Sequence, residues 1–101
     1  MITDAWKQIA EKNGLKECLV KLGEECEELD HAIGDYFGEL NEATSNAEID
    51  KARDHVVEEC ADVRACIDQI LWHWHGEAEC DAIMQWKCVR TMQRMREEER
   101  G

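Results

Sequence analysis

The chain contains no proline, and its six glycines are scattered singly. Because proline interrupts helices and glycine weakens them, their scarcity predicts long, uninterrupted helices. No window alternates strictly between apolar and polar residues, as a half-buried strand would. At 101 residues the chain suffices for one domain with a modest core. We therefore expect a single all-α domain over residues 1–101, arranged like a four-helix bundle.

Positive charge is also scarce, since 12 Lys and Arg stand against 24 Asp and Glu, for a net charge of −12. Nucleic acid is not an expected partner, because contacts along a phosphate backbone need clustered Lys and Arg. Nucleotides stay open as ligands, since bound cations can meet their phosphates. No segment reaches membrane-spanning length, and residues 1–10 lack the apolar run of a signal peptide. We expect a cytoplasmic protein with no membrane partner.

The six cysteines include no Cys-x-x-Cys pair. Cys18, Cys26 and Cys60 fall on or near the apolar positions of predicted helices. A disulfide framework is the alternative, but cytosolic cysteines stay reduced and pack as small hydrophobic side chains. We predict buried thiols.

Capping and glycine signals divide the chain into four predicted helices. Ser45 followed by Glu48 matches a capping box, which would open the third helix. Gly34 and Gly38 weaken the end of the second helix, so we expect a loop at residues 38–45. The helices are expected from a cap at Thr3 or Asp4 to residue 13, at 15–33 or slightly beyond, at 46–75 and at 77–99.

Two acidic segments repeat one pattern, Gly23-Glu24-Glu25-Cys26-Glu27-Glu28-Leu29 and Val57-Glu58-Glu59-Cys60-Ala61-Asp62-Val63. On an ideal helix, Glu25 and Glu28 lie roughly 80° and 140° from the centre of their apolar stripe. Glu59 and Asp62 take nearly the same two angles. The two stripes comprise Leu15, Leu19, Leu22, Cys26, Leu29 and Ile33, and Val56, Cys60, Val63, Ile67, Ile70 and Trp74. Two helices therefore carry matched carboxylate pairs on the same shoulder of the same kind of face.

Four carboxylates from two helices supply hard oxygen ligands, which suit Mg²⁺ or Mn²⁺ better than zinc. Acids on a helix usually serve only solubility, but two matched copies at equal angles favour a metal site. A di-iron bundle would need Glu-x-x-His on two helices, and only Glu28 with His31 supplies that spacing. The iron reading therefore lacks its second histidine.

A basic face marks the last predicted helix, where Lys87, Arg90 and Arg94 recur at spacings of three and four. One interpretation is a solvated face that pairs with the acidic helices. The other is that these cations receive phosphates near the carboxylates.

The acidic segments resemble the signature of the MazG-like all-α nucleoside triphosphate pyrophosphohydrolases, which reads Glu-Glu-x-x-Glu on one helix and Glu-x-x-Asp on the next. The matching residues are Lys21-Leu-Gly-Glu-Glu-Cys-Glu-Glu-Leu29 and Glu58-Glu-Cys-Ala-Asp-Val63. Lys87-Cys-Val-Arg-Thr-Met-Gln-Arg94 is similar to the family's C-terminal basic helix. The resemblance covers roughly residues 13 to 96 and looks most like short stand-alone members of phages and bacteria.

The resemblance implies hydrolysis of NTPs or dNTPs between the α- and β-phosphates, giving a monophosphate and pyrophosphate. It also implies a homodimer or homotetramer, with the nucleotide held between subunits. The Mg²⁺ ligands it implies are Glu25, Glu28, Glu59 and Asp62, with Glu24 as a further acid for a second metal or the attacking water. The phosphate contacts it implies are Lys87 and Arg94 and, more weakly, Lys21 and Arg90.

Two departures from the family pattern bear on the pocket. The gap of 30 residues between Glu28 and Glu59 is longer than the family leads us to expect, which suggests an insertion at residues 38–45 near the pocket. Thr91 also stands where many members carry Asn, which leaves one sugar or phosphate contact without its usual residue.

Base and sugar recognition has weaker signals. Trp72 falls opposite the apolar stripe of its helix, and Gln69 and His73 continue the shoulder of Glu59. Large aromatic residues such as Trp6 more often serve a core or an interface than a base. The candidates for base or sugar contacts are Trp6, Gln69, Trp72 and His73.

Two functions of different classes follow. The first is a Mg²⁺-dependent nucleotide pyrophosphohydrolase. The alternative is a non-catalytic acidic helical oligomer that binds a metal or a basic partner.

Overall fold

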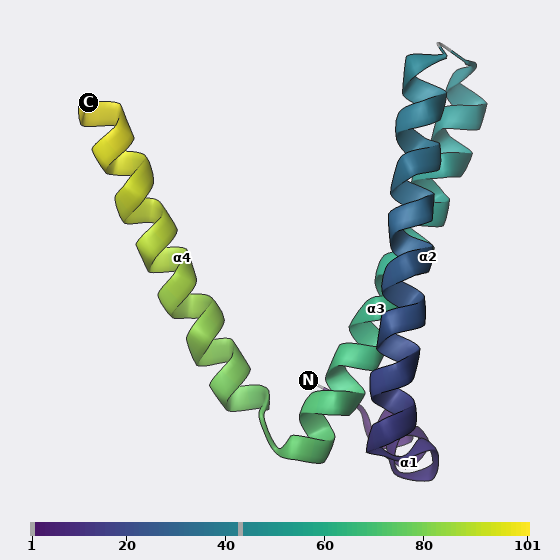
Figure 1. The fold of residues 1–101 in the computed structure, drawn as a ribbon, viewed down its shortest axis with the longest axis vertical. Helices are drawn as coiled ribbons and strands as arrows, with labels where there is room; N and C mark the ends of the chain where they lie inside the picture. The colour runs from purple at the N-terminus through teal and green to yellow at the C-terminus, as the bar shows by residue number, and fades with distance from the viewer. Residues whose placement is uncertain (1, 43) are drawn as a thin grey trace.

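The computed structural model describes residues 2–42 and 44–101, which form four α-helices and no β-strand. Figure 1 shows α2 and α3 side by side as a long antiparallel hairpin, with α1 at its base and α4 leaving that base as a separate arm. The helices are α1 (Asp4–Asn13), α2 (Leu15–Asn41), α3 (Asn46–Trp74) and α4 (Glu77–Arg100). The all-α class predicted from the sequence is confirmed.

The predicted caps start the helices where expected. Thr3 Oγ1 accepts a hydrogen bond from the backbone N–H of Trp6 at 3.3 Å, and Ser45 Oγ accepts one from Glu48 at the same distance. Each bond satisfies a donor that the first helical turn leaves without a partner. Gly14 separates α1 from α2 at φ 80°, a conformation that side chains disfavour.

The second helix is longer than predicted. It continues through Gly34 and Gly38 to Asn41, so within the expected loop at residues 38–45 only Glu42, Thr44 and Ser45 are described outside a helix, and Ala43 lies outside the described residues. Tertiary packing against α3 overrides the weak helix propensity of the two glycines. The stretch between Glu28 and Glu59 therefore extends the hairpin beyond the acidic segments.

The seam between α2 and α3 follows alternating spacings of three and four residues, the pattern of a coiled coil. The buried or half-buried positions on this repeat are Leu15, Cys18, Leu22, Glu25, Leu29, Ala32, Tyr36 and Glu39 of α2, and Ile49, Ala52, Val56, Glu59, Val63, Cys66, Ile70 and His73 of α3. Glu25 and Glu59 thus occupy core positions, where a coiled coil ordinarily places apolar side chains.

This seam corrects the predicted apolar stripes. Six residues assigned to those stripes are exposed: Leu19, Cys26, Ile33, Cys60, Ile67 and Trp74. Each helix carries apolar residues both in the seam and on a neighbouring outer face, and the sequence pattern merged the two faces into one. The hairpin therefore keeps an apolar surface in addition to its core.

Helix α1 closes the base of the hairpin. Ala10 is fully buried, and its carbonyl oxygen lies 2.8 Å from His73 Nε2. Cys18 Sγ donates a hydrogen bond to Gln69 Oε1 across the hairpin at 3.7 Å, and Gln69 Nε2 donates to the Ala65 carbonyl at 3.1 Å. Polar contacts thus tie α1, α2 and α3 together at this end.

The cysteines differ from the prediction of buried thiols. All six are free, and burial raises the pKa of the Cys18 and Cys66 thiols. Exposed thiols stand at Cys26, Cys60 and Cys88, and Cys80 is half-buried. The prediction is wrong for the exposed three, because two belong to the outer face and one to α4.

Helix α4 makes few contacts with the other helices of its own chain. It contacts only α3, and none of its residues is buried. Its large apolar side chains are between 44% and 64% exposed: Ile83, Met84, Trp86, Val89, Met92 and Met95. In proteins most of the stability of a helix comes from tertiary packing of its apolar face. Within one chain, α4 does not complete a four-helix bundle.

No helix of the described residues combines the length and apolar character that crossing a bilayer requires.

Candidate functional site

Three carboxylates meet across the seam in the middle of the hairpin. Glu25 of α2 and Glu59 and Asp62 of α3 each offer an oxygen, and these oxygens lie within 4.8 Å of one another. Glu59 is only 8% exposed and Glu25 is half-buried, whereas Asp62 faces solvent. The matched acidic segments therefore converge on one point, because the antiparallel hairpin places them side by side.

Two oxygens of this cluster have no protein partner. The Oε2 atoms of Glu25 and Glu59 are both buried and accept no hydrogen bond from the described residues. The other oxygen of Glu59 lies 3.3 Å from His55 Nε2. Because a buried carboxylate without a partner is unfavourable, such atoms are expected to take up a proton or a cation.

The pKa values of two carboxyl groups in the cluster are raised by this environment. Burial is the main cause that raises the pKa of Glu25, and the neighbouring Glu28 raises it further by a hydrogen bond and by charge. Burial also raises the pKa of Glu59, helped by Glu28 and Asp62 and opposed by His55. A bound cation would relieve both the desolvation and the mutual repulsion.

Glu28 joins the cluster from its solvent side. It lines a hollow of about 670 Å³ beside the three carboxylates. The residues around this hollow are Glu24, Glu27, Glu28, His31, His55 and Glu59. The structure thus gathers the four predicted metal ligands and Glu24 in one region, three of them in direct proximity.

His55 is a neighbour of the site to which the sequence analysis assigned no role. About half of its side-chain surface is exposed, and its Nε2 atom pairs with Glu59, which lies one turn further along α3. The sequence feature that could have revealed this contact is the spacing of four residues between His55 and Glu59, which places both side chains on one helix face.

The predicted phosphate-binding cations lie elsewhere in this chain. Lys87, Arg90 and Arg94 are exposed on α4, and the Arg90 guanidinium stacks 4.7 Å from the centre of the Trp86 ring. The ion pairs among the described residues are Lys7–Asp4, Arg53–Asp54 and His55–Glu59, so the basic face makes none with the acidic helices. Only Lys21, one turn before Glu25, lies on the hairpin.

The residues predicted to contact the nucleobase or sugar lie near the end of the hairpin where α1 packs. Gln69 and His73 form the hydrogen bonds that join α1, α2 and α3, and Trp72 packs edge-on against the His73 ring at 5.0 Å. Trp6 is on α1 and is 42% exposed. None of the four lines the hollow beside Glu59.

Fold and site together define an all-α protein with a carboxylate cluster between two antiparallel helices. The donors are all oxygens, and two of them are buried without a partner among the described residues, which fits a hard divalent cation such as Mg²⁺ or Mn²⁺. Comparisons of the chain with known protein families, characterised proteins and solved structures give no match.

Proposed function

We propose that this protein is a Mg²⁺-dependent nucleotide pyrophosphohydrolase that cleaves NTPs or dNTPs between the α- and β-phosphates. The observation that carries the proposal is that Glu25 and Glu59, on two helices with the same acidic pattern, each hold a buried carboxylate oxygen without a partner among the described residues. A solubilising acidic surface does not explain them, since solubility needs exposed charge. The resemblance of these segments to the MazG-like signature agrees with the same activity.

The carboxylates of Glu25, Glu28, Glu59 and Asp62 would hold the cation in this proposal. When bound, Mg²⁺ or Mn²⁺ supplies charge neutralisation for phosphate oxygens and lowers the pKa of a water. The acidic hairpin would otherwise repel a triphosphate. The hollow of about 670 Å³ beside the cluster offers space for phosphates.

Hydrolysis needs a water in line with the α-phosphorus and a group that takes its proton. Glu24 lines the hollow and can accept that proton. The water oxygen bonds to the α-phosphorus while the bond to the bridging oxygen breaks, and pyrophosphate leaves with the electron pair. No residue forms a covalent intermediate, so the thiols need no catalytic role.

A second copy of the chain would supply the phosphate-binding cations. Helix α4 holds Lys87, Arg90 and Arg94 and points away from its own hairpin (Figure 1). Its large apolar side chains and those on the outer face of the hairpin are exposed in the described part of the chain. If α4 packs on the hairpin of another copy, apolar surface is buried and the cations approach the carboxylates.

The direct test is incubation of the protein with each NTP and dNTP in the presence of Mg²⁺ or Mn²⁺. The expected products are the monophosphate and pyrophosphate, and chelation should stop their formation. If no nucleotide is cleaved at ample enzyme, the activity is excluded. Metal binding without cleavage would instead support the non-catalytic oligomer.

A further inference from the structure

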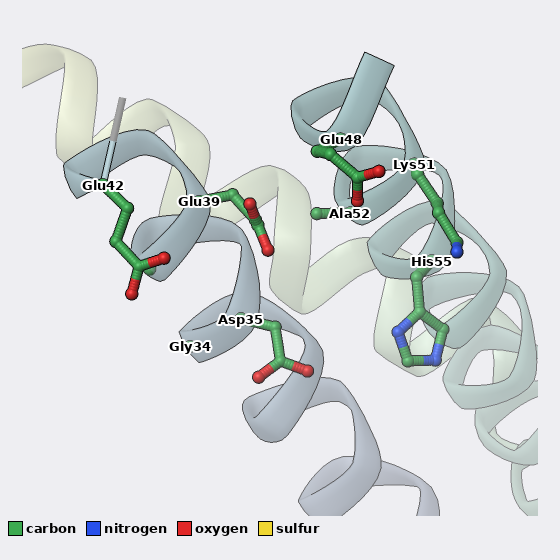
Figure 2. A pocket seen from close by; sticks show the side chains of 9 residues that line it. Gly34, Asp35, Glu39, Glu42, Glu48, Lys51, Ala52 and His55 are labelled. Atoms are coloured by element: carbon green, nitrogen blue, oxygen red, sulfur yellow. The ribbon is translucent and has the colours of Figure 1, made fainter. Parts of the chain in front are cut away.

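A second hollow of about 460 Å³ lies between α2 and α3 on the side of the carboxylate cluster toward the hairpin tip. Figure 2 shows its walls, with Asp35 and Glu39 on α2, Glu42 directly after it, and Glu48, Lys51 and His55 on α3. His55 also lines the hollow beside Glu59. The two hollows therefore share a wall residue and lie next to each other along the hairpin, and we call the one nearer the hairpin tip the tip groove.

Two glycines leave the α2 side of this groove without side chains. Gly34 and Gly38 are four residues apart, so they share one helix face. A Cβ added at either position would meet nothing within 4 Å. Both lie inside α2 without positive φ, so neither its backbone nor close packing requires glycine there.

The position of the carboxylate cluster indicates how a bound nucleotide would be oriented along the hairpin. Glu59 is 8% exposed, its Oε2 has no partner, and it lines the adjoining hollow. The triphosphate of the proposed reaction would be held there. Lys51 lies two helical turns from Glu59, about 12 Å along the axis toward the tip. Toward the base of the hairpin, Gln69 and His73 are already engaged in hydrogen bonds within the fold.

The walls of the tip groove offer carboxylate acceptors and, in Lys51, an exposed ammonium donor. Glu39 is already engaged, since its Oε2 accepts a hydrogen bond from Thr44 Oγ1 at 2.7 Å. Asp35 and Glu48 make no hydrogen bond or ion pair through their carboxylates within the described residues. Lys51 likewise has no ion pair there. Carboxylates accept hydrogen bonds from base amino groups, and Lys donates to the N7 and O6 of guanine.

We propose that this tip groove binds the nucleoside end of the substrate and favours guanine. This inference rests on the proposed pyrophosphohydrolase function and adds its base preference. Guanine combines the O6 and N7 acceptors that Lys51 needs with an amino donor for a wall carboxylate. Thymine and uracil present neither an amino group nor an N7, so they offer the wall carboxylates a single ring N–H and Lys51 carbonyl oxygens alone.

The first test fills the groove from its glycine side. Gly34→Leu places a side chain in the hollow, and Gly23→Leu makes the same change on α2 at a position that lines neither hollow. Leu is a better helix former than Gly, so both variants should fold, which circular dichroism checks. We expect Gly34→Leu to lower kcat/KM for dGTP about 10-fold, mainly through KM, and Gly23→Leu to leave it unchanged.

The second test removes the base donor. We expect wild-type protein to cleave dGTP with a kcat/KM at least about 10-fold above that for dTTP, and Lys51→Met to bring the ratio close to one. Lys16→Met, an exposed Lys on α2 outside both hollows, should preserve the ratio. The ratio distinguishes base recognition from a structural effect, because a structural effect would lower kcat/KM equally for both substrates.

The outcomes separate the two proposals. If the wild type cleaves dGTP and dTTP equally and Gly34→Leu behaves as Gly23→Leu, the groove inference is overturned while the hydrolase function stands. A preference for another base that Lys51→Met leaves unchanged also overturns it. If no nucleotide is cleaved at all, the hydrolase function fails, and the inference that rests on it fails too.

Discussion

The α2–α3 hairpin and helix α4 expose opposite deficiencies. The hairpin gathers three carboxylates at its seam, and two of their oxygens are buried without a partner among the described residues. Helix α4 carries a basic face that makes no ion pair among the described residues, and it buries none of its side chains. What one region lacks the other supplies, yet they diverge from a common base (Figure 1). The proposed functional unit, with more than one chain and a bound cation, would supply both of these missing partners.

The largest expected effect comes from the buried member of the hairpin cluster. Glu59→Gln keeps the shape of the side chain but removes a ligand charge, so it should lower kcat/KM by at least about 100-fold. Its matched control is Glu58→Gln, an adjacent exposed acid outside the cluster, which should retain activity. Assays of pyrophosphate release with equal, folded amounts of each variant measure the difference. Equal rates for both variants would remove Glu59 from the site.

The next effect should come from α4. Val89→Glu together with Met92→Glu introduces charge on its exposed apolar surface, where the two side chains are 48% and 44% exposed. Burial of these carboxylates in a contact would be unfavourable, so we expect a monomer with little activity. Sedimentation analysis measures the mass.

Gln93→Glu is the matched control on α4, because Gln93 is already polar and exposed. It should assemble and react as the wild type does. If the double variant keeps both its mass and its activity, this surface of α4 is not the contact between chains.

A smaller but more specific effect is expected on mixing two inactive variants. Glu59→Gln damages the hairpin and Lys87→Ala with Arg94→Ala damages the basic face, so a mixed dimer contains one intact site if the two regions meet between chains. In a fully exchanged equal mixture, about a quarter of the sites should recover activity. Mixing each variant with more of itself is the control. Absence of recovery after verified subunit exchange would place both regions of a site in one chain.

The smallest expected effect is on stability against pH. Because the pKa values of Glu25 and Glu59 are raised in the folded state, that state binds more protons than the unfolded chain above about pH 4.3. Stability without metal should therefore fall as pH rises through this range. Mg²⁺ should restore it most strongly at the higher pH, where the ligands are ionised.

Thermal unfolding of metal-free protein measures this trend. Glu59→Gln should reduce the loss of stability with rising pH more than Glu58→Gln does. This difference distinguishes the effect of the cluster from the general repulsion within a chain of net charge −12. The same slope in both variants would mean that general repulsion alone accounts for the pH dependence.

Much of the secondary structure could be predicted from local signals. The cap residues Thr3 and Ser45 and the stop at Gly14 act within one turn, so they are readable from the sequence. The prediction failed at Gly34 and Gly38, because packing against α3 determines whether a weak helix continues. Local propensity does not contain that information.

The sequence by itself determined the all-α class, the helix caps and the doubled acidic pattern with its four carboxylates. It also determined that Lys87, Arg90 and Arg94 share a face, since helical spacing alone sets this. Only the tertiary structure decided that Glu25 and Glu59 lie in the seam, that Cys26 and Cys60 face outward, and that α4 leaves its own hairpin. The reason is physical: a helix with two apolar faces has no preference between them until a partner helix covers one.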